Sequence, residues 1–221
     1  MPTSMPAHSA HAHPAISVRQ ASRHFGDLCV FSDVSFEVAA GRCCAIVGAN
    51  GAGKSTLLRC VIGADRLDHG SITVHGRLVD ESSATFRATV AAVVGEPALF
   101  AHLTAHEHLQ LVGVAHGAVD PYTSATRILD QVGLAEIADQ LPVTMSSGQR
   151  HRLALGSALV RPRTIVVLDE PEQHLDTGGR AWLAEAINAE KHAGTAALLV
   201  SHDHTLVTAV ADEIVDGDSW R

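Results

Sequence analysis

Apolar residues along this chain of 221 residues follow two different strand patterns. Within residues 15–40, the segments ISVRQ and VSFEV alternate apolar and polar positions, which predicts antiparallel strands with one buried face. SITVHGRLV and TVAAVVG, both after residue 70, are predicted to pair with those strands. Three further segments begin as continuous apolar runs and predict buried strands: CCAIVG (43–48), TIVVLDEP (164–171) and AALLVSHD (196–203).

Residues 96 to about 143 change to helical periodicity. Thr104 and Glu107 have the spacing of a capping box, which predicts a helix that begins after Thr104. Asp120 followed by Pro121 predicts the start of a second helix, because proline is favoured in the first turn. We therefore expect a helical unit between two groups of strands.

The stretch GANGAGKST, residues 48–56, lies between an apolar run and a predicted helix, KSTLLRCVIG, at 54–63. It satisfies G-x-x-x-x-G-K-[ST] in the strand, loop and helix context of a phosphate-binding loop. Glycines let backbone N–H groups turn toward phosphate oxygens, and the helix N-terminus adds a partial positive charge. Lys54 is predicted to reach the β and γ phosphates, and the Ser55 hydroxyl to be a ligand of Mg²⁺. The residues expected to bind the nucleotide here are Gly48, Asn50, Gly51, Ala52, Gly53, Lys54, Ser55 and Thr56.

Three later segments show what kind of phosphate-binding protein this is. MSSGQRHRLALGSALVRP, residues 145–162, places a Ser/Gly turn before an amphipathic helix. The predicted strand that follows ends in two adjacent carboxylates, Asp169 and Glu170. The last buried strand is followed by His202.

In this order and spacing, the segments resemble those of the ATP-binding cassette (ABC) family, the motor subunits of ABC transporters, over nearly the whole chain. The loop at 48–56 resembles the Walker A segment, LDE at 168–170 the end of Walker B, LD at 175–176 the D-loop, and His202 the switch histidine. The resemblance implies that Phe25 stacks on adenine. MSSGQ resembles the LSGGQ signature, the most specific of these motifs, and implies nucleotide contacts from Ser146, Ser147, Gly148 and Gln149.

The chemistry of these residues agrees with the resemblance. Mg²⁺ retains much of its water, so the Ser55 hydroxyl and the Asp169 carboxylate suffice as protein ligands. Glu170 is then expected to orient or deprotonate the attacking water, while His202 holds the γ-phosphate and Lys54 neutralises it. The alternatives are a solvated strand end for the two carboxylates and an ordinary hydrogen-bonded polar residue for His202.

The resemblance implies an α/β fold, in which a P-loop NTPase core carries an antiparallel β lobe and an inserted helical subdomain. We expect a disordered tail at 1–14 and a single ABC ATPase domain at 15–221. Its nucleotide-binding core would comprise 15–95 and 144–221, and the helical subdomain 96–143. In the family two cassettes pack head to tail around ATP, so one copy of each motif implies a second ABC ATPase subunit, identical or different.

Composition limits the remaining function classes. A net charge of −8 with scattered arginines argues against nucleic-acid binding, so ATP is the expected polyanion. The apolar runs are far shorter than the roughly 18 residues needed to cross a bilayer, and no charged-then-apolar leader begins the chain. We therefore expect a cytoplasmic protein, peripheral at the inner face of the cell membrane. The cysteines form no C-x-x-C pair and predict buried thiols: Cys29, Cys43, Cys44 and Cys60.

The helical segment at 96–143 is also the expected contact with integral membrane permease subunits. A groove around residues 95–110 would receive a short permease helix, with Leu99, Phe100 and Leu103 as apolar contacts; packing within the lobe is the alternative. Four histidines gather in the same segment: His102, His106, His108 and His116. Because Thr104 is expected to cap between His102 and His106, contact with solvent or the permease is favoured over a metal site.

The expected function is ATP hydrolysis that powers transport through separately encoded permease subunits. A soluble ABC ATPase of the iron–sulfur assembly type is the first alternative, and an ATP-binding partner of low turnover is the second. Departures from the family pattern support the latter: Gly95 stands where the Q-loop glutamine is usual, Ser147 replaces a signature glycine, and EQHLD at 172–176 alters the D-loop. Glu96 is the substitute ligand if the Q-loop shifts by one residue. The transported substrate and its direction leave no trace in this sequence.

Overall fold

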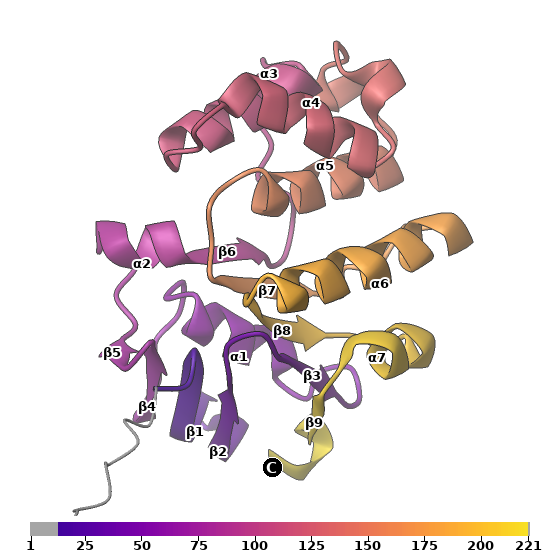
Figure 1. The fold of residues 1–221 in the computed structure, drawn as a ribbon. Coiled ribbons are helices and arrows are strands. Elements are labelled where there is room, and N and C mark those ends of the chain that lie inside the picture. The colour runs from indigo at the N-terminus through magenta and orange to yellow at the C-terminus, as the bar shows by residue number, and fades with distance from the viewer. Residues whose placement is uncertain (1–12, 221) are drawn as a thin grey trace, which may run out of the picture.

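The computed structural model describes residues 13–220, which fold into two sheets and a set of covering helices (Figure 1). The expected tail at 1–14 therefore lies outside the described residues, except for its last two positions. The strands are β1 (Ile16–Phe25), β2 (Leu28–Val38), β3 (Cys43–Val47), β4 (His69–Val74), β5 (Arg77–Leu78), β6 (Val90–Val93), β7 (Ile165–Asp169), β8 (Ala196–Val200) and β9 (Glu213–Asp216). The α-helices are α1 (Lys54–Val61), α2 (Ala84–Thr89), α3 (Ala105–Ala115), α4 (Pro121–Gln131), α5 (Ser147–Leu159), α6 (Thr177–His192) and α7 (His204–Val210). Short 3-10 turns are η1 (Ala135–Ile137), η2 (Pro142–Thr144) and η3 (Gly217–Trp220).

The antiparallel sheet has the strand order β2-β1-β4-β5, as the alternating segments predict. Ile16 of β1 lies opposite Val38 of β2 and Val74 of β4, so apolar side chains of three strands share one face. This face packs on α1 and on one side of the second sheet. The alternation in sequence therefore corresponds to a sheet with one buried and one solvated face.

The second sheet is parallel, with the order β6-β7-β8-β3-β9. The central strands β3, β7 and β8 are apolar along nearly their whole length because both faces are covered, whereas the edge strand β9 is largely exposed. In β3, Cys44 and Ile46 face the core shared with the antiparallel sheet, whereas Cys43 and Ala45 face the core formed with α5, α6 and α7. The carboxyl ends of β3, β7 and β8 meet at one edge, so the loops that follow these strands converge there (Figure 1).

The expectation that TVAAVVG pairs with the antiparallel strands is wrong. Within it, β6 pairs in parallel with β7, with Val90 opposite Ile165 and Val93 opposite Leu168. The preceding helix α2, which the sequence patterns did not predict, turns the chain toward the parallel sheet. A short run of small and branched apolar residues fits either sheet, so its partner depends on the chain path and not on its periodicity.

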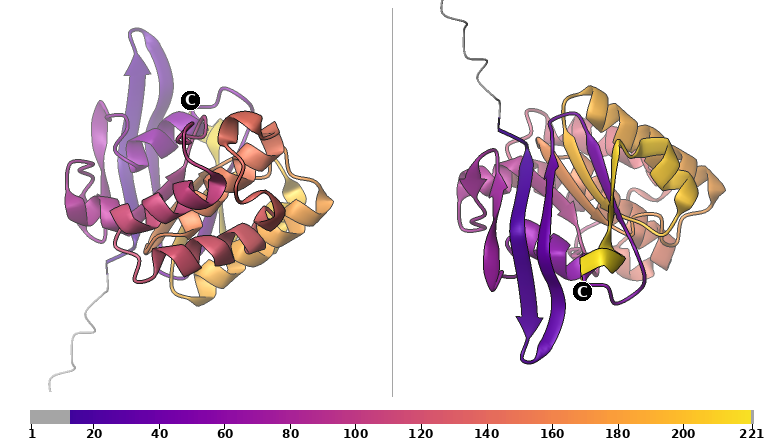
Figure 2. Two further views of the ribbon diagram at one scale, coloured as in Figure 1. Left: turned by 90° about the horizontal axis from the view of Figure 1, so that it is seen from above. Right: turned by 90° about the horizontal axis from the view of Figure 1, so that it is seen from below.

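The helical unit packs on α5, over the parallel sheet, as the view from above shows (Figure 2). The capping box is confirmed: Thr104 accepts a hydrogen bond from the Glu107 N–H, and the Glu107 side chain accepts from the Thr104 N–H. The second helix also begins as predicted, with Asp120 as N-cap and Pro121 in the first turn. The core of this unit is formed by side chains of α3, α4 and α5, including Leu109, Ile128, Leu129 and Leu153.

The structure changes the expectation for two residues of the proposed permease contact. His108 is only 1% exposed, where contact with solvent or permease was expected, and its Nε2 lies 2.8 Å from the Ser157 hydroxyl. Leu99 is half-buried against the cores on both sides of α5, so packing within the protein accounts for it. Phe100 is 52% exposed and stays available to a partner.

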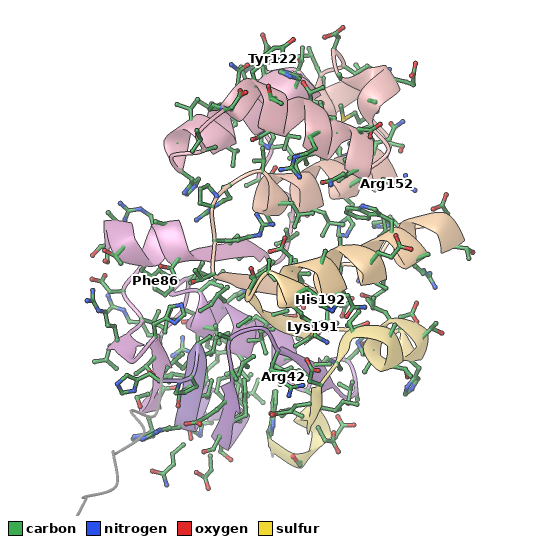
Figure 3. The ribbon with its side chains drawn as sticks, viewed as in Figure 1. Arg42, Phe86, Tyr122, Arg152, Lys191 and His192 are labelled. Carbon is green, nitrogen blue, oxygen red and sulfur yellow. The ribbon has the colours of Figure 1, made fainter. Side chains whose placement is uncertain are left out.

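The C-terminal segment, which contains β9 and η3, packs against both sheets. Asp212, just before β9, pairs with Arg42 at 3.0 Å and with Lys191 at 2.9 Å; both basic residues are labelled in Figure 3. Trp220 packs edge-on against Phe31 of β2, with ring centroids 6.2 Å apart, and the view from below shows the C-terminal segment beside β2 (Figure 2). Between residues 13 and 220, no helix is long and apolar enough to cross a membrane.

The cysteines are free thiols, as the sequence predicts. Cys43, Cys44 and Cys60 are buried, and Cys29 is half-buried. Burial raises the pKa of Cys43 and of Cys44 to about 12 and that of Cys60 to about 11. These three thiols are therefore protonated core residues and not nucleophiles at neutral pH.

Candidate ATPase active site

The phosphate-binding loop runs from the end of β3 to the start of α1. Gly53, the N-cap of α1, has a φ of 92°, and a Cβ there would lie 2.9 Å from the Val30 carbonyl oxygen. Glycine is therefore required both by the left-handed backbone and by the close approach of β2. No side chain of the described residues caps α1, so the N–H groups of its first turn can bind a phosphate.

The side chains of Lys54 and Asp218 both form hydrogen bonds with the backbone of this loop. Lys54 is only 5% exposed, and its Nζ donates to the carbonyl oxygens of Gly48 and Ala49, both at 2.8 Å. Asp218, from η3, accepts a hydrogen bond from the Ala49 N–H at 2.8 Å. The ammonium group is thus held inside the loop, where a phosphate would meet it. Asp218 lies 169 positions away from Ala49, so no local sequence signal marked it as part of this loop.

Asp169 ends β7 beside this loop, and the Ser55 hydroxyl lies close enough to its carboxylate to lower the pKa of that group. Burial raises the pKa of Asp169 above its ordinary value, against the lowering effects of Ser55 and the nearby cations. Its Oδ1 is buried and receives no hydrogen bond from any residue in the described part of the chain. A buried carboxylate oxygen without a donor, next to a hydroxyl, suits a hard divalent cation. Ser55 and Asp169 therefore fit Mg²⁺.

Glu170 follows Asp169 in a left-handed conformation, with a φ of 47°. Such a backbone is strained for a residue with a Cβ, and strain of this kind gathers at functional sites. Its N–H bonds the Val200 carbonyl oxygen at 2.8 Å, which joins the ends of β7 and β8. Its carboxylate lies between two side chains: His202 Nε2 is 3.4 Å from Oε1, and the Gln173 amide donates to Oε2.

Glu172 is a buried carboxylate that sequence analysis noted only as part of an altered D-loop. It is 7% exposed, and its Oε1 accepts hydrogen bonds from the Ser201 hydroxyl at 2.7 Å and from the His202 N–H at 3.0 Å. It therefore fixes the backbone that carries His202 relative to the segment after Glu170. A Glu within a turn gives no sequence signal of burial, so this contact could not be foreseen.

Phe25 lies at the end of β1 and is 51% exposed. It lines a cavity of about 280 Å³ together with residues of the phosphate loop and Glu170. The Arg23 guanidinium lies 4.6 Å from the centre of its ring on one side. An exposed ring beside a phosphate-binding loop can stack on a planar base, as the resemblance implies for adenine.

A larger cavity of about 820 Å³ adjoins the first, and Ser55 and Glu170 line both. Asp169 and Gln173 also line it, and Gly95 and Glu96 lie in its wall. Gly95 has a φ of 74° and places no side chain there. The Mg²⁺ ligands and the expected base thus share this cavity with the altered Q-loop.

The signature segment begins α5. Ser146 is its N-cap, and Ser146 and Gln149 form a capping box with hydrogen bonds of 3.2 and 2.8 Å. Gly148 packs so closely on the segment after Glu170 that a Cβ there would lie 2.9 Å from the His174 carbonyl oxygen. Ser147 lines the 820 Å³ cavity, but none of the four signature residues lines the cavity shared by Phe25 and the phosphate loop.

Two further contacts join α5 to the segment after Glu170. His151 Nε2 lies 2.8 Å from the Pro171 carbonyl oxygen. The Arg152 guanidinium, labelled in Figure 3, pairs with Asp176 at 2.9 Å. Neither residue of α5 carried a sequence signal for these contacts, because their partners become neighbours only when α5 packs beside the loop that follows β7. The signature helix and the D-loop are therefore mechanically connected.

Comparison with known proteins agrees with this geometry. The sequence pattern of the family described as ABC transporter matches residues 31–173. The chain belongs to the ABC transporter family of ATP-binding subunits. It is accordingly an ATPase that binds ATP and couples its hydrolysis to transport through permease subunits. The antiparallel β lobe, parallel P-loop sheet and helices form the fold of this family.

Individual relatives are similar over most of the chain. The aliphatic sulfonates import ATP-binding protein SsuB of Cupriavidus necator is 41% identical over 207 residues, which cover 91% of this chain and 65% of that protein. The aliphatic sulfonates import ATP-binding protein SsuB 2 of Burkholderia cenocepacia is 35% identical over 205 residues, 92% of this chain and 74% of that protein. A solved ATP-binding subunit of an ABC transporter matches with a TM-score of 0.82 and 28% identity, over 91% of this chain and 85% of that one.

Proposed function

We propose that this ABC transporter ATPase energises an importer, bound peripherally to integral permease subunits at the cytoplasmic face of the membrane. The direction is supported by the two relatives above, both of which are named import proteins. Both relatives are named for aliphatic sulfonates, and we propose this class of cargo for the assembled transporter. The permease, and not this subunit, would select that cargo.

The observation that carries the proposed site is the pair of carboxylates at the end of β7. Asp169 has a buried oxygen without a hydrogen-bond donor from the described residues, while Glu170 accepts from the Gln173 amide and lies 3.4 Å from His202 Nε2. The first fits a metal ligand and the second a base. Because the two neighbours have different surroundings, they can take different roles.

Each residue then has a defined task. Lys54 and the first turn of α1 would bind the phosphates, and the Phe25 ring would bind the adenine face. Mg²⁺, held by Ser55 and Asp169, would neutralise charge on the phosphate oxygens. Glu170 would accept a proton from the attacking water, and His202 would donate a hydrogen bond to the γ-phosphate.

A second cassette is proposed to complete the site. The signature residues do not line the cavity that Phe25 shares with the phosphate loop, so a signature serine from another chain would have to contact the γ-phosphate. The exposed Ser147 in the first turn of α5 suits this role, because its hydroxyl and the helix N-terminus both favour an anion. ATP would then lie between two subunits and close the dimer.

Replacing the base tests the hydrolytic site. Glu170→Gln keeps the shape of the side chain but cannot accept the proton, so turnover should fall by about 100-fold or more while ATP still binds. An ATP-dependent dimer should accumulate in size-exclusion chromatography. Glu185→Gln, at an exposed position on α6, is the control and should behave as wild type. Unchanged turnover in Glu170→Gln would refute the role of Glu170.

A charge at the signature tests the dimer. In the Glu170→Gln background, Ser147→Glu should prevent the ATP-dependent dimer because its carboxylate repels the γ-phosphate of the partner's nucleotide. An acidic residue in the first turn favours the helix, so α5 should remain folded. Ser147→Gln is the uncharged control of the same size. A dimer that persists with Ser147→Glu would contradict this arrangement.

A charge on the helical unit tests the permease contact. Phe100→Glu should abolish co-purification with an integral membrane protein from solubilised membranes. Val119→Glu is the matched control, because Val119 is also an exposed apolar residue of the helical unit. Equal losses in both variants, or none in either, would count against docking at Phe100.

A further inference from the structure

Gln173 lies in the turn that follows Glu170. Its backbone N–H bonds the Glu170 carbonyl oxygen at 3.1 Å, which keeps its side chain near the carboxylate. Its Nε2 donates to Glu170 Oε2, while His202 Nε2 lies 3.4 Å from Oε1. An amide therefore donates to one oxygen of the carboxylate, and an imidazole nitrogen lies near the other.

The Gln173 amide has a second polar end. Its Oε1 receives no hydrogen bond from residues 13–220, and the side chain is exposed where it lines the 820 Å³ cavity. An amide oxygen is a neutral acceptor and can take an O–H from water. Gln173 therefore offers a donor to the base and an acceptor to a water molecule that stands in front of it.

The wall formed by the altered Q-loop offers no such group. Gly95 lines the same cavity without a side chain, and the nearest atom to a Cβ there would be Arg59 Nη2, at 3.9 Å. Glu96 also lines the cavity, but its carboxylate would repel both Glu170 and phosphate oxygens. Among the described residues that line this cavity, Gln173 carries the one side-chain amide.

We propose that Gln173 is the positioning residue of hydrolysis in this chain, and that it supplies from the D-loop the amide oxygen that Gly95 lacks. The inference rests on the proposed role of Glu170. The water oxygen forms a bond to the γ-phosphorus while the bond from the γ-phosphorus to the bridging oxygen breaks, and ADP leaves with that electron pair. One water proton passes to Glu170. Gln173 holds Glu170 through its N–H and accepts the other O–H of the water, so it directs the lone pair at phosphorus without itself changing bonds.

The test compares Gln173→Ala with Gln131→Ala, an exposed glutamine at the end of α4. Gln173→Ala should lower kcat about 10- to 100-fold, because a hydrogen bond to a charged group is lost together with the acceptor for water. KM and equilibrium ATP affinity should stay within about threefold, because no phosphate contact is removed. The ATP-dependent dimer should become more abundant, because hydrolysis opens it. Gln131→Ala should match wild type in kcat, KM, ATP affinity and the amount of dimer.

Restoring an amide across the cavity separates positioning from a structural role. Gly95→Gln in the Gln173→Ala background should recover at least about threefold of the lost kcat, although the left-handed φ is strained for a residue with a Cβ. Gly95→Leu in the same background carries the same strain without an amide and should recover nothing. Gly95→Asn is added because asparagine tolerates this backbone, so a folded protein with an amide is obtained even if Gly95→Gln melts early.

Three results would overturn the inference. The first is wild-type kcat in Gln173→Ala, and the second is a loss of kcat together with ATP affinity, which indicates a structural role. The third is an equal recovery of kcat by the amide and the leucine substitutions at Gly95 in the Gln173→Ala background. The failure of the proposed active site looks different: Glu170→Gln would then keep its turnover. If Glu170→Gln is inactive and Gln173→Ala is not, only the role of Gln173 is refuted.

Discussion

Replacing Glu172 by leucine is expected to destabilise the protein by about 3 kcal/mol. The Glu172 carboxylate accepts from the Ser201 hydroxyl at 2.7 Å and from the His202 N–H at 3.0 Å. Ser201 is 1% exposed, so leucine leaves a buried hydroxyl and an amide without an acceptor, at about 1–3 kcal/mol each. Apolar burial of the leucine and removal of the buried carboxylate charge together offset about 1–2 kcal/mol of this loss. For a chain of 221 residues, a net 3 kcal/mol lowers Tm by about 6–12 °C.

Glu172→Gln is the matched variant, because it keeps an acceptor oxygen in the same place. Its NH₂ group would replace Oε2, which is buried and without a hydrogen-bond partner among residues 13–220. Removing a buried charge compensates for the weaker hydrogen bonds, so we expect Glu172→Gln to stay within about 1 kcal/mol of wild type. Turnover should follow the same order, since His202 is positioned through its backbone N–H.

Calorimetry of the nucleotide-free protein measures the difference, with urea denaturation as a second probe. ATP turnover at 25 °C, where both variants are folded, then reports the effect on His202. A Glu172→Leu protein that melts like wild type would refute the argument from unpaired donors. If Glu172→Leu and Glu172→Gln lose the same amount of stability, then Ser201 and His202 require the charge of Glu172 and not only an acceptor oxygen.

Three further predictions concern the loop, the signature and the helical unit. Lys54→Ala should weaken ATP binding at least about 10-fold in equilibrium titration, because the phosphate charge loses its buried partner; unchanged affinity would contradict the role of Lys54. Gly148→Ala should destabilise the protein by about 1–3 kcal/mol and lower Tm by several degrees, because the new Cβ would lie 2.9 Å from the His174 carbonyl oxygen. Ala154→Gly, in the same helix, is the comparison, because it loses only helix propensity and the packing of one methyl group. Burial lowers the pKa of His108, so the unfolded chain takes up its proton first and stability should fall as the pH drops below the ordinary value of 6.5. His108→Gln should flatten part of that slope in urea denaturation between pH 7 and 5, and an unchanged slope would refute the contribution.

The sequence determined the elements whose signals are local. The phosphate loop needs glycines, a lysine and a hydroxyl at fixed spacing because the backbone itself forms the anion site, and the structure has that loop between a strand and a helix. The capping residues Thr104 and Asp120 likewise act within one helical turn, so the start of each helix was predicted correctly. Continuous apolar runs identified three strands that are covered on both faces, β3, β7 and β8.

Only the tertiary structure decided which distant groups meet. The pairing of β6 with β7 depended on the path of the chain through α2, which no periodicity recorded. Asp218 reaches the phosphate loop, and Glu172 reaches the turn before His202, across long stretches of sequence. Burial of a carboxylate and the direction of an amide are properties of the packed surroundings, since water satisfies both groups equally well in the unfolded chain. The chemistry of this ATPase was therefore encoded in its motifs, while the contacts that hold Glu170 and His202 arose only when the ends of β7 and β8 came together.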